Sequence, residues 1–317
     1  MCFSFSFSLA SCFLQRLFTI FVVVILKSAT SLQNFPDPTL LRRSIPESCP
    51  RTLKMINMEV SRTNPKLAFM HITKAGGTTV EWVLHREASA RNYSRISERR
   101  NLYAKEVPLF KLPKSANFVT MLREPTSRFA SYIHFRKYDT SPKYQRHGRE
   151  LLWTARAFSN LYTRMLTGIP TGYQYAERAS ASRECTKAKK ILEERFAVVG
   201  TSERMLESMA VMGYVFSFQN FPVFGRINQQ IGAPKFSAFS TKVRMRVIRE
   251  NKCDRMLYKV ADNLLDRAMH CLGSEFTEYL EAFSEAQHKF TNSSPSCIGK
   301  CIKYGEVHRS GKAKTNI

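Results

Sequence analysis

Residues 69–82 of the chain read FMHITKAGGTTVEW, in which a lysine and two glycines separate an apolar run from a helical pattern beginning at Thr78. A strand that delivers glycines to the start of a helix forms an anion-binding site, because backbone N–H groups approach the ligand and the helix dipole favours negative charge. Nucleotide triphosphatases place the lysine after the glycines and follow it with Ser or Thr. Here Lys74 precedes Gly76 and Gly77, a position that suits a group projecting beyond the bound phosphate. The stretch therefore predicts a phosphate site of unusual order; the simpler alternative is a tight Gly-Gly turn.

A second strand with a basic residue at its end follows further along. Residues 119–135 read VTMLREPTSRFASYIHF, so that Arg123 leaves the strand and Ser131 comes eight residues later on the next helix. In open α/β sheets, ligands bind beyond the carboxyl ends of the strands. Arg123 and Ser131 are therefore expected to hold a second phosphate group of the same ligand. Taken alone, the Arg-Glu-Pro turn is equally consistent with a local ion pair.

Apolar runs that favour strands alternate with helical patterns over most of the chain. This alternation predicts an α/β fold in one domain, with a parallel sheet flanked by helices on both faces. The expected strands are 66–72, 117–123 and 196–200, and the expected helices are 78–89, 125–138, 150–168 (ending at Gly168), 182–194, 201–216 and 253–272.

The N-terminal residues predict a targeting segment. Residues 17–26 (LFTIFVVVIL) are uninterruptedly apolar, which matches the core of a signal peptide and is too short to span a bilayer alone. Residues 1–27 are expected to be either a signal peptide or a signal anchor. Residues 28–64, which contain several prolines, are expected to be a stem or linker. The folded domain is then expected over 65–291, and a polar, disordered tail over 292–317.

The chain of 317 residues carries a formal net charge of +24 and has a pI of about 10.0, which predicts an acidic partner. Basic and acidic residues mix along most of the sequence, a pattern that favours a folded domain with a positive face over a basic tail. Nucleic acid, an anionic membrane surface and an anionic polysaccharide all fit this charge. A secretory signal favours the polysaccharide and disfavours nucleic acid.

The cysteines agree with a secretory destination. Six lie beyond the targeting segment: Cys49, Cys185, Cys253, Cys271, Cys297 and Cys301. An even number predicts disulfides, although six cysteines allow fifteen full pairings. No second pair of His or Cys follows the Cys297–Cys301 spacing closely, so a zinc site is the weaker interpretation. Two glycosylation sequons, at Asn92 and Asn292, fit the same destination.

Taken together, the two loops resemble those of the Golgi sulfotransferases that use 3′-phosphoadenosine 5′-phosphosulfate as donor. HITKAGGTT (71–79) is similar to their 5′-phosphosulfate loop, and LREPTSRFASY (122–132) is similar to their 3′-phosphate motif. Within this family, the chain looks most like the branch of the uronyl and the heparan-sulfate 2-O and 6-O sulfotransferases. Weaker similarity continues through 160–168, 196–212 and 257–269, so the resemblance covers roughly residues 66–272.

The resemblance implies a P-loop-like three-layer fold and transfer of a sulfuryl group to a carbohydrate hydroxyl, without a metal. Lys74 would contact the phosphosulfate bridge and stabilise the charge that develops on the departing phosphate. Arg123 and Ser131 would hold the 3′-phosphate, whereas Arg128 would either assist or, as the favoured interpretation, be a solvated helix residue. The 5′-phosphate would be cradled by Ala75, Gly76, Gly77, Thr78 and Thr79.

The general base is where this chain departs from its relatives. Sulfuryl transfer needs a group that takes the proton of the acceptor hydroxyl. Asn101 stands where relatives of the 2-O type carry a His, and an amide cannot act as a base. The candidates nearby are Glu106, which is ranked first, and His85, seven residues beyond Thr78. Reduced or lost activity is the alternative.

Two other function classes stay open. A P-loop nucleotide kinase would need Lys-Ser or Lys-Thr after the glycines and an acidic metal ligand at a strand end, and the second strand ends in Arg123 instead. A non-enzymatic binder of anionic glycan fits the charge and the Asn101 departure. The expected location is the Golgi membrane with a lumenal domain, or secretion after signal cleavage. Acceptor sugar, hydroxyl position and oligomeric state are left open.

Overall fold

The computed structural model describes residues 49, 53, 67–90, 102–105, 108–112, 114, 116–136, 149–225 and 233–293. All of them belong to one compact unit, Pro38–Ile317. Its centre is a sheet of four strands in the order β2-β1-β3-β4, and every neighbouring pair is parallel. The strands are β1 (Leu67–Met70), β2 (Leu102–Lys105), β3 (Asn117–Leu122) and β4 (Phe196–Thr201).

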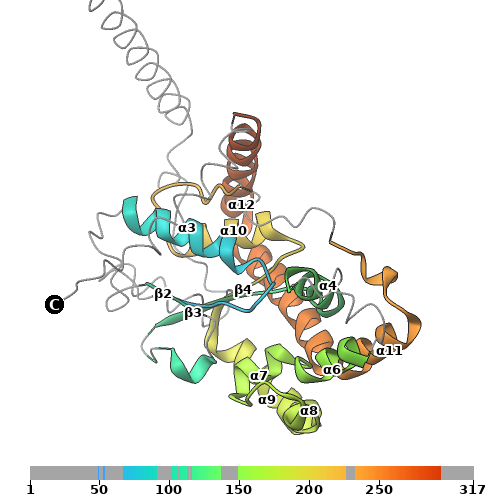
Figure 1. The fold of residues 1–317 in the computed structure, drawn as a ribbon. Coiled ribbons are helices and arrows are strands. Elements are labelled where there is room, and N and C mark those ends of the chain that lie inside the picture. Colours follow the sequence, from blue (N-terminus) through green and yellow to red (C-terminus); the bar gives the residue numbers. More distant parts are fainter. Residues whose placement is uncertain are drawn as a thin grey trace, which may run out of the picture. The chain divides into compact units, whose positions relative to one another are not determined.

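The order of the strands creates a switch point in the sheet. From β1 the chain moves outward to β2 and then returns past β1 to form β3 on its other side (Figure 1). Leu67 is accordingly paired with Leu102 in β2 and with Asn117 in β3. The loops that leave β1 and β3 therefore run in opposite directions from adjacent strand ends, which is where open α/β sheets bind ligands.

Helices cover both faces of the sheet, as the sequence predicts. α3 and α10 lie on one face, and α7 and α9 lie on the other (Figure 1). The helices are α3 (Gly77–Ala90), α4 (Pro125–Phe135), α6 (Arg149–Ala157), α7 (Leu161–Thr167), α8 (Ala176–Ser180), α9 (Ser182–Arg195), α10 (Met205–Val215), α11 (Thr241–Glu250) and α12 (Lys252–Ser293), with short 3₁₀ turns η1 (Leu109–Lys111), η2 (Tyr173–Tyr175) and η3 (Phe236–Ala238). α12 is interrupted at Gly273, whose φ of 76° is not helical.

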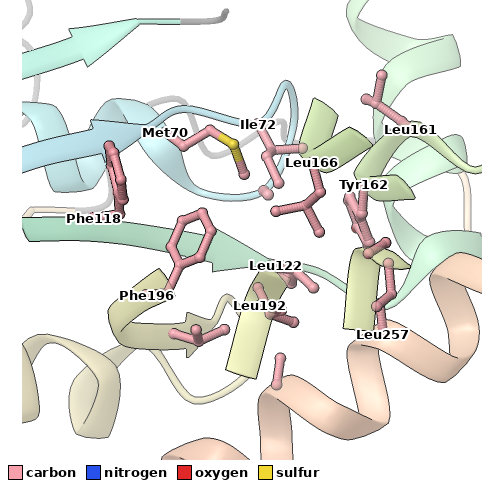
Figure 2. Close-up of a cluster of buried hydrophobic side chains, with 14 of the residues drawn as sticks. Met70, Ile72, Phe118, Leu122, Leu161, Tyr162, Leu166, Leu192, Phe196 and Leu257 are labelled. Carbon is pink, nitrogen blue, oxygen red and sulfur yellow. The ribbon is translucent and has the colours of Figure 1, made fainter. Parts of the chain in front are cut away.

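The main core lies between the sheet and the helices α7, α9 and α12. Figure 2 shows side chains of the strands meeting side chains of these helices, with Tyr162 and Leu257 on the helix side. Met70, Phe118 and Phe196 come from three neighbouring strands and are 0–3% exposed. Burial of such side chains stabilises the fold by roughly 1.5–3 kcal/mol each. This layer fixes the positions of the strand ends that carry the two predicted phosphate loops.

The expected helix over 150–168 is wrong in one respect, because it is two helices. α6 ends at Ala157 and α7 begins at Leu161, with Asn160 between them in the left-handed region at φ 45°. The backbone N–H of Asn160 donates to Asn251 Oδ1 at 3.1 Å, so the break is held by α12 and its preceding residue. Gly168 ends α7 at φ 79°, as its position predicts.

Disulfides are confirmed for four of the cysteines. Cys49 is joined to Cys271, and Cys185 to Cys253. Cys297 and Cys301 lie outside the described residues. Within the expected linker 28–64, Cys49 and Leu53 are described, and both are at most 4% exposed. The chain near Cys49 is therefore attached covalently to α12.

Candidate functional site

The loop after β1 makes a tight turn that presents Lys74. The N–H of Ala75 donates to the carbonyl oxygen of Ile72 at 3.1 Å, and Ala75 itself is fully buried. Lys74 adopts φ 65° and Gly76 adopts φ 81°. A positive φ is rare for a residue with a side chain and raises its conformational energy by about 1–2 kcal/mol. The turn thus holds a lysine in a conformation that the surrounding contacts must maintain.

The glycines are required because neighbouring groups come close to their Cα atoms. A Cβ on Gly77 would lie 2.0 Å from Cδ2 of His71, and one on Gly76 would lie 2.6 Å from Cε of Met205. His71 is itself held, since its Nδ1 lies 2.9 Å from Oε1 of Glu81 on α3. The rigid imidazole ring therefore packs directly against the start of α3.

The first turn of α3 offers hydrogen-bond donors to an anion. The first N–H groups of a helix have no acceptor within it, and in α3 these belong to Gly77 and Thr78. The N–H of Thr79 already donates to the carbonyl oxygen of Gly76 at 3.1 Å. Thr78 is exposed and Thr79 is 8% exposed. This turn contains no acidic residue, so its dipole meets no competing carboxylate there.

Arg123 stands at the end of β3, on the other side of the switch point. Its Nη1 donates to the carbonyl oxygen of Lys74 at 3.4 Å, which joins the two loops. Its own backbone is clamped by Tyr162, whose hydroxyl accepts from the N–H of Arg123 at 3.2 Å and donates to its carbonyl oxygen. Burial raises the pKa of Tyr162, so the hydroxyl keeps the proton that it donates.

The start of α4 is already capped. Glu124 accepts a hydrogen bond from the N–H of Ser127 at 2.8 Å and another from the hydroxyl of Thr126. A carboxylate therefore occupies the position that an anion would otherwise take at this helix terminus. A phosphate near Arg123 would have to be held by side chains instead. Ser131 is the predicted partner, and it is 8% exposed on the same helix.

The favoured interpretation of Arg128 as a solvated residue is wrong. Arg128 is 2% exposed, and its Nη2 donates to the carbonyl oxygen of Phe158 at 3.3 Å. Its guanidinium carbon lies 5.5 Å from the centre of the Tyr162 ring. The Arg128 charge also opposes the effect of burial on the pKa of Asp254, which is raised overall. Arg128 thus belongs to the packing between α4, α7 and α12.

The side chain of Lys74 lies against α4. Its ammonium nitrogen is 4.3 Å from the centre of the Phe135 ring, in the last turn of that helix. Phe135 is 56% exposed, so the ring is accessible to solvent around this contact. Lys74, Arg123 and the face of α4 with Phe135 are thereby brought to one edge of the sheet.

β4 contributes the third side of this edge. The N–H of Ser202 donates to the carbonyl oxygen of Leu122 at 2.8 Å, and Ser202 also lies beside Gly76. Glu203 accepts from the N–H of Glu124 at 3.2 Å and from the hydroxyl of Tyr258 at 3.2 Å. The ends of β3 and β4 are therefore tied together around the loop of Lys74.

Of the two predicted catalytic bases, the structure describes His85 and not Glu106. His85 is exposed and lies on α3 about 12 Å along the helix axis from Gly77, at about 1.5 Å per residue. Glu106 and Asn101 lie outside the described residues. Both bases stay predictions.

Sequence reasoning missed several residues of this site. His71, Phe135 and Tyr162 each contact a predicted residue, yet none belongs to a recognisable motif position for a ligand. For Tyr162 the only available signal was an aromatic residue on a helix, and that usually indicates core. Their roles depend on contacts between segments that are distant in the sequence.

The described residues bear on metal binding and on membrane insertion. They contain no group of three or more His, Cys, Asp or Glu side chains placed to hold a metal ion. None of their helices is long and apolar enough to cross a membrane. The predicted targeting segment, 1–27, lies outside them.

Comparison with protein-family models finds no match to the chain, and comparison with curated proteins finds none either. The resemblance to sulfotransferases stays a prediction.

Proposed function

We propose that the protein is a sulfotransferase that moves a sulfuryl group from 3′-phosphoadenosine 5′-phosphosulfate to a hydroxyl of a carbohydrate. The observation that carries this proposal is the meeting of two basic loops at the switch point of the sheet. Arg123 Nη1 lies 3.4 Å from the carbonyl oxygen of Lys74, although the two residues are 49 positions apart. A ligand with two separate phosphate groups fits such a pair of sites, whereas a ligand with one needs only the first.

Each residue then has a chemical role. The N–H groups of Gly77 and Thr78 bind the 5′-phosphate, and Lys74 faces the bridge between this phosphate and the sulfuryl group. Arg123 and Ser131 bind the 3′-phosphate. During transfer, the bond between sulfur and the bridging oxygen breaks, and its electron pair stays on the 5′-phosphate. A new bond forms between sulfur and the acceptor oxygen, whose proton passes to a general base.

The hydrogen-bonding groups at the two helix starts suit a sulfuryl donor with two phosphate groups. The first turn of α3 has no carboxylate and can accept a phosphate, while the start of α4 is blocked by Glu124 and cannot. The 3′-phosphate must therefore rely on side chains, and Arg123 is a strong choice because its guanidinium can bind a phosphate through two N–H groups. The P-loop-like three-layer assignment is part of the same proposal, supported by the parallel sheet and its helices.

The location and partners follow as proposals. Disulfides persist in oxidising compartments, so the bonds Cys49–Cys271 and Cys185–Cys253 support a lumenal or secreted domain. The net charge of +24 supports an anionic glycan as acceptor. The N-terminal apolar segment would attach the protein to the Golgi membrane.

Donor-product binding tests the proposal directly. We expect adenosine 3′,5′-bisphosphate to bind the full-length protein in calorimetry, and Lys74→Ala and Arg123→Ala to weaken binding about tenfold or more. Arg123→Ala should also remove any preference for the bisphosphate over adenosine 5′-phosphate. Arg183→Ala, at an exposed arginine of α9, is the matched control and should bind as the wild type does.

The outcome separates the function classes. If folded wild-type protein does not bind the bisphosphate, the sulfotransferase proposal fails and a non-enzymatic glycan binder becomes the better explanation. Magnesium-dependent binding and turnover of ATP would instead favour a nucleotide kinase. Bisphosphate binding that is unchanged in Arg123→Ala would place the 3′-phosphate elsewhere.

Transfer itself is tested with radiolabelled donor and a panel of desulfated heparin, chondroitin and dermatan. Glu106→Gln should abolish transfer and leave bisphosphate binding intact, because only the proton acceptor is lost. His85→Gln should retain transfer. The reverse pattern would assign the base to His85, and loss of binding in Glu106→Gln would give Glu106 a different role.

A further inference from the structure

A cation–π contact joins Lys74, in the loop after β1, to Phe135 on α4. Phe135 is a large apolar side chain that is 56% exposed, in the last turn of α4. One face of its ring carries the ammonium of Lys74, with Nζ 4.3 Å from the ring centre. A cation at this distance from an aromatic centre is attracted by the negative face of the ring.

The position of Phe135 on α4 links it to the predicted phosphate residue. Ser127, Ser131 and Phe135 are spaced four residues apart, so they lie on one face of the helix. The side chain of Phe135 therefore continues, toward the end of α4, the face that carries Ser131. One helix face thus connects the residue predicted to bind the 3′-phosphate with the lysine predicted to face the sulfuryl group.

Lys74 is held at both ends by this arrangement. Arg123 donates to the carbonyl oxygen of Lys74. The φ of Lys74, 65°, sets the direction in which the lysine side chain leaves the loop. A lysine side chain has four rotatable bonds and normally loses considerable entropy when it is confined to one orientation. An aromatic ring at its end reduces this cost, because the ammonium already lies in one place before a ligand arrives.

We propose that Phe135 is a positioning residue that holds the Lys74 ammonium in place to meet the sulfuryl end of the donor. This inference rests on the proposed function. A preorganised charge stabilises a developing negative charge better than one that must first reorient. The electron pair released from the sulfur remains on the bridging oxygen of the 5′-phosphate, and this is the charge that the positioned ammonium meets.

Binding of two ligands tests the role without any acceptor. 3′-Phosphoadenosine 5′-phosphosulfate carries the sulfuryl group, and adenosine 3′,5′-bisphosphate lacks it. For Phe135→Leu we expect affinity for the bisphosphate, whose free 5′-phosphate carries the charge that Lys74 meets, to fall about fivefold, while affinity for the sulfated donor changes less than twofold. Phe135→Tyr keeps the aromatic face and should retain the wild-type ratio of the two affinities.

Two controls separate positioning from a structural effect. Phe110→Leu makes the same change at another exposed phenylalanine, on the turn η1 that leads into β3, and should leave both affinities unchanged. In a Lys74→Ala background, Phe135→Leu should have no further effect, since the ring acts through the lysine.

The results distinguish failure of the positioning role of Phe135 from failure of the proposed function. Equal weakening of both ligands, or an undiminished effect of Phe135→Leu in the Lys74→Ala background, overturns the positioning role. A wild-type protein that binds both ligands, with Phe135→Leu indistinguishable from it, overturns the role and leaves the proposed function standing. A folded wild type that binds neither ligand overturns both proposals.

Discussion

The guanidinium of Arg123 donates to the backbone carbonyl of Lys74 at 3.4 Å, and this contact joins the ends of β1 and β3. The two residues come from different strand–loop–helix units that are adjacent only because of the strand order β2-β1-β3-β4. The arginine thus has two tasks, since one N–H group holds the lysine loop while the others are available for an anion. Substitutions around this pair are therefore expected to change the free energy of unfolding, the affinity for the donor product, or both.

Tyr162→Phe should weaken both the fold and the donor site. The change removes the hydroxyl that clamps the backbone of Arg123 on both sides and leaves its N–H without that acceptor. We expect the free energy of unfolding to fall by about 1–3 kcal/mol and the Kd for adenosine 3′,5′-bisphosphate to rise about fivefold. Urea denaturation and calorimetry measure the two effects. Tyr173→Phe, at a tyrosine that is 42% exposed, should change neither; wild-type affinity in Tyr162→Phe would show that the clamp does not position Arg123.

The glycines of the Lys74 loop should differ in their tolerance of a methyl group. Gly77→Ala places a Cβ 2.0 Å from the His71 ring, which Glu81 holds, so the ring or the helix must move. We expect a loss of about 2–3 kcal/mol in the free energy of unfolding. Gly76→Ala meets the flexible end of Met205 at 2.6 Å and Oγ of Ser202 at 3.3 Å, so its cost should be mainly that of the positive φ, about 1–2 kcal/mol.

Gly225→Ala serves as the control for this series, because a Cβ there has no neighbour within 4 Å among the residues that the structure describes. Its free energy of unfolding should match that of the wild type within about 0.5 kcal/mol. If Gly77→Ala proved as harmless as Gly225→Ala, the close packing of His71 against α3 would be refuted.

Asp254→Asn should be strongly destabilising. Asp254 is fully buried in α12 and accepts hydrogen bonds from the backbone N–H groups of Tyr162 (2.9 Å) and Thr163 (3.0 Å) at the start of α7. An amide would turn an NH₂ group toward one of these donors and would remove the carboxylate that interacts electrostatically with the buried Arg128. The expected loss is about 3 kcal/mol in urea denaturation.

The comparison for this variant is Asp262→Asn. Asp262 is 42% exposed at its side chain and shares Arg204 with Glu207 and Asp266, so the loss should be below about 1 kcal/mol. Similar losses in the two variants would mean that the buried position of Asp254 carries no special weight.

The disulfide pairing is testable by peptide mapping. A digest under non-reducing conditions should yield one peptide that joins Cys49 to Cys271 and another that joins Cys185 to Cys253. Cys271→Ser should lower the free energy of unfolding by about 2–5 kcal/mol, because the bond closes a long loop. The measurement is urea denaturation of the oxidised proteins. Recovery of Cys49 linked to Cys297 or Cys301 would contradict this pairing.

Most of the elements around the site follow from the sequence. The apolar runs that end before Lys74 and at Arg123 are β1 and β3, and the helices after them begin at Gly77 and Pro125. The expected strand 196–200 is β4, which extends one residue further to Thr201, and the helix expected from Thr201 begins at Met205. These predictions hold because glycine loops, proline at a first helical turn and hydrophobic periodicity are local signals.

Two predictions from local sequence patterns were wrong. The stretch 150–168 has continuous helical periodicity, but Asn251 and Asp254 offer hydrogen bonds at Asn160, Tyr162 and Thr163 that compensate for breaking the helix there. Arg128 has the appearance of a surface residue in sequence, but it packs against Phe158 and Tyr162 and is buried. In both cases the partner lies far away along the chain, so no local pattern contains it.

The sequence by itself determined the two strand–loop–helix units, their basic residues and the positions of the glycines, because these depend on neighbours within a few residues. Only the tertiary structure decided that β1 lies beside β3, that Arg123 contacts the Lys74 loop and that Phe135 lies against the lysine. Such contacts depend on strand order and on how helices pack across the sheet, and hydrophobic periodicity specifies which face is buried without specifying its partner.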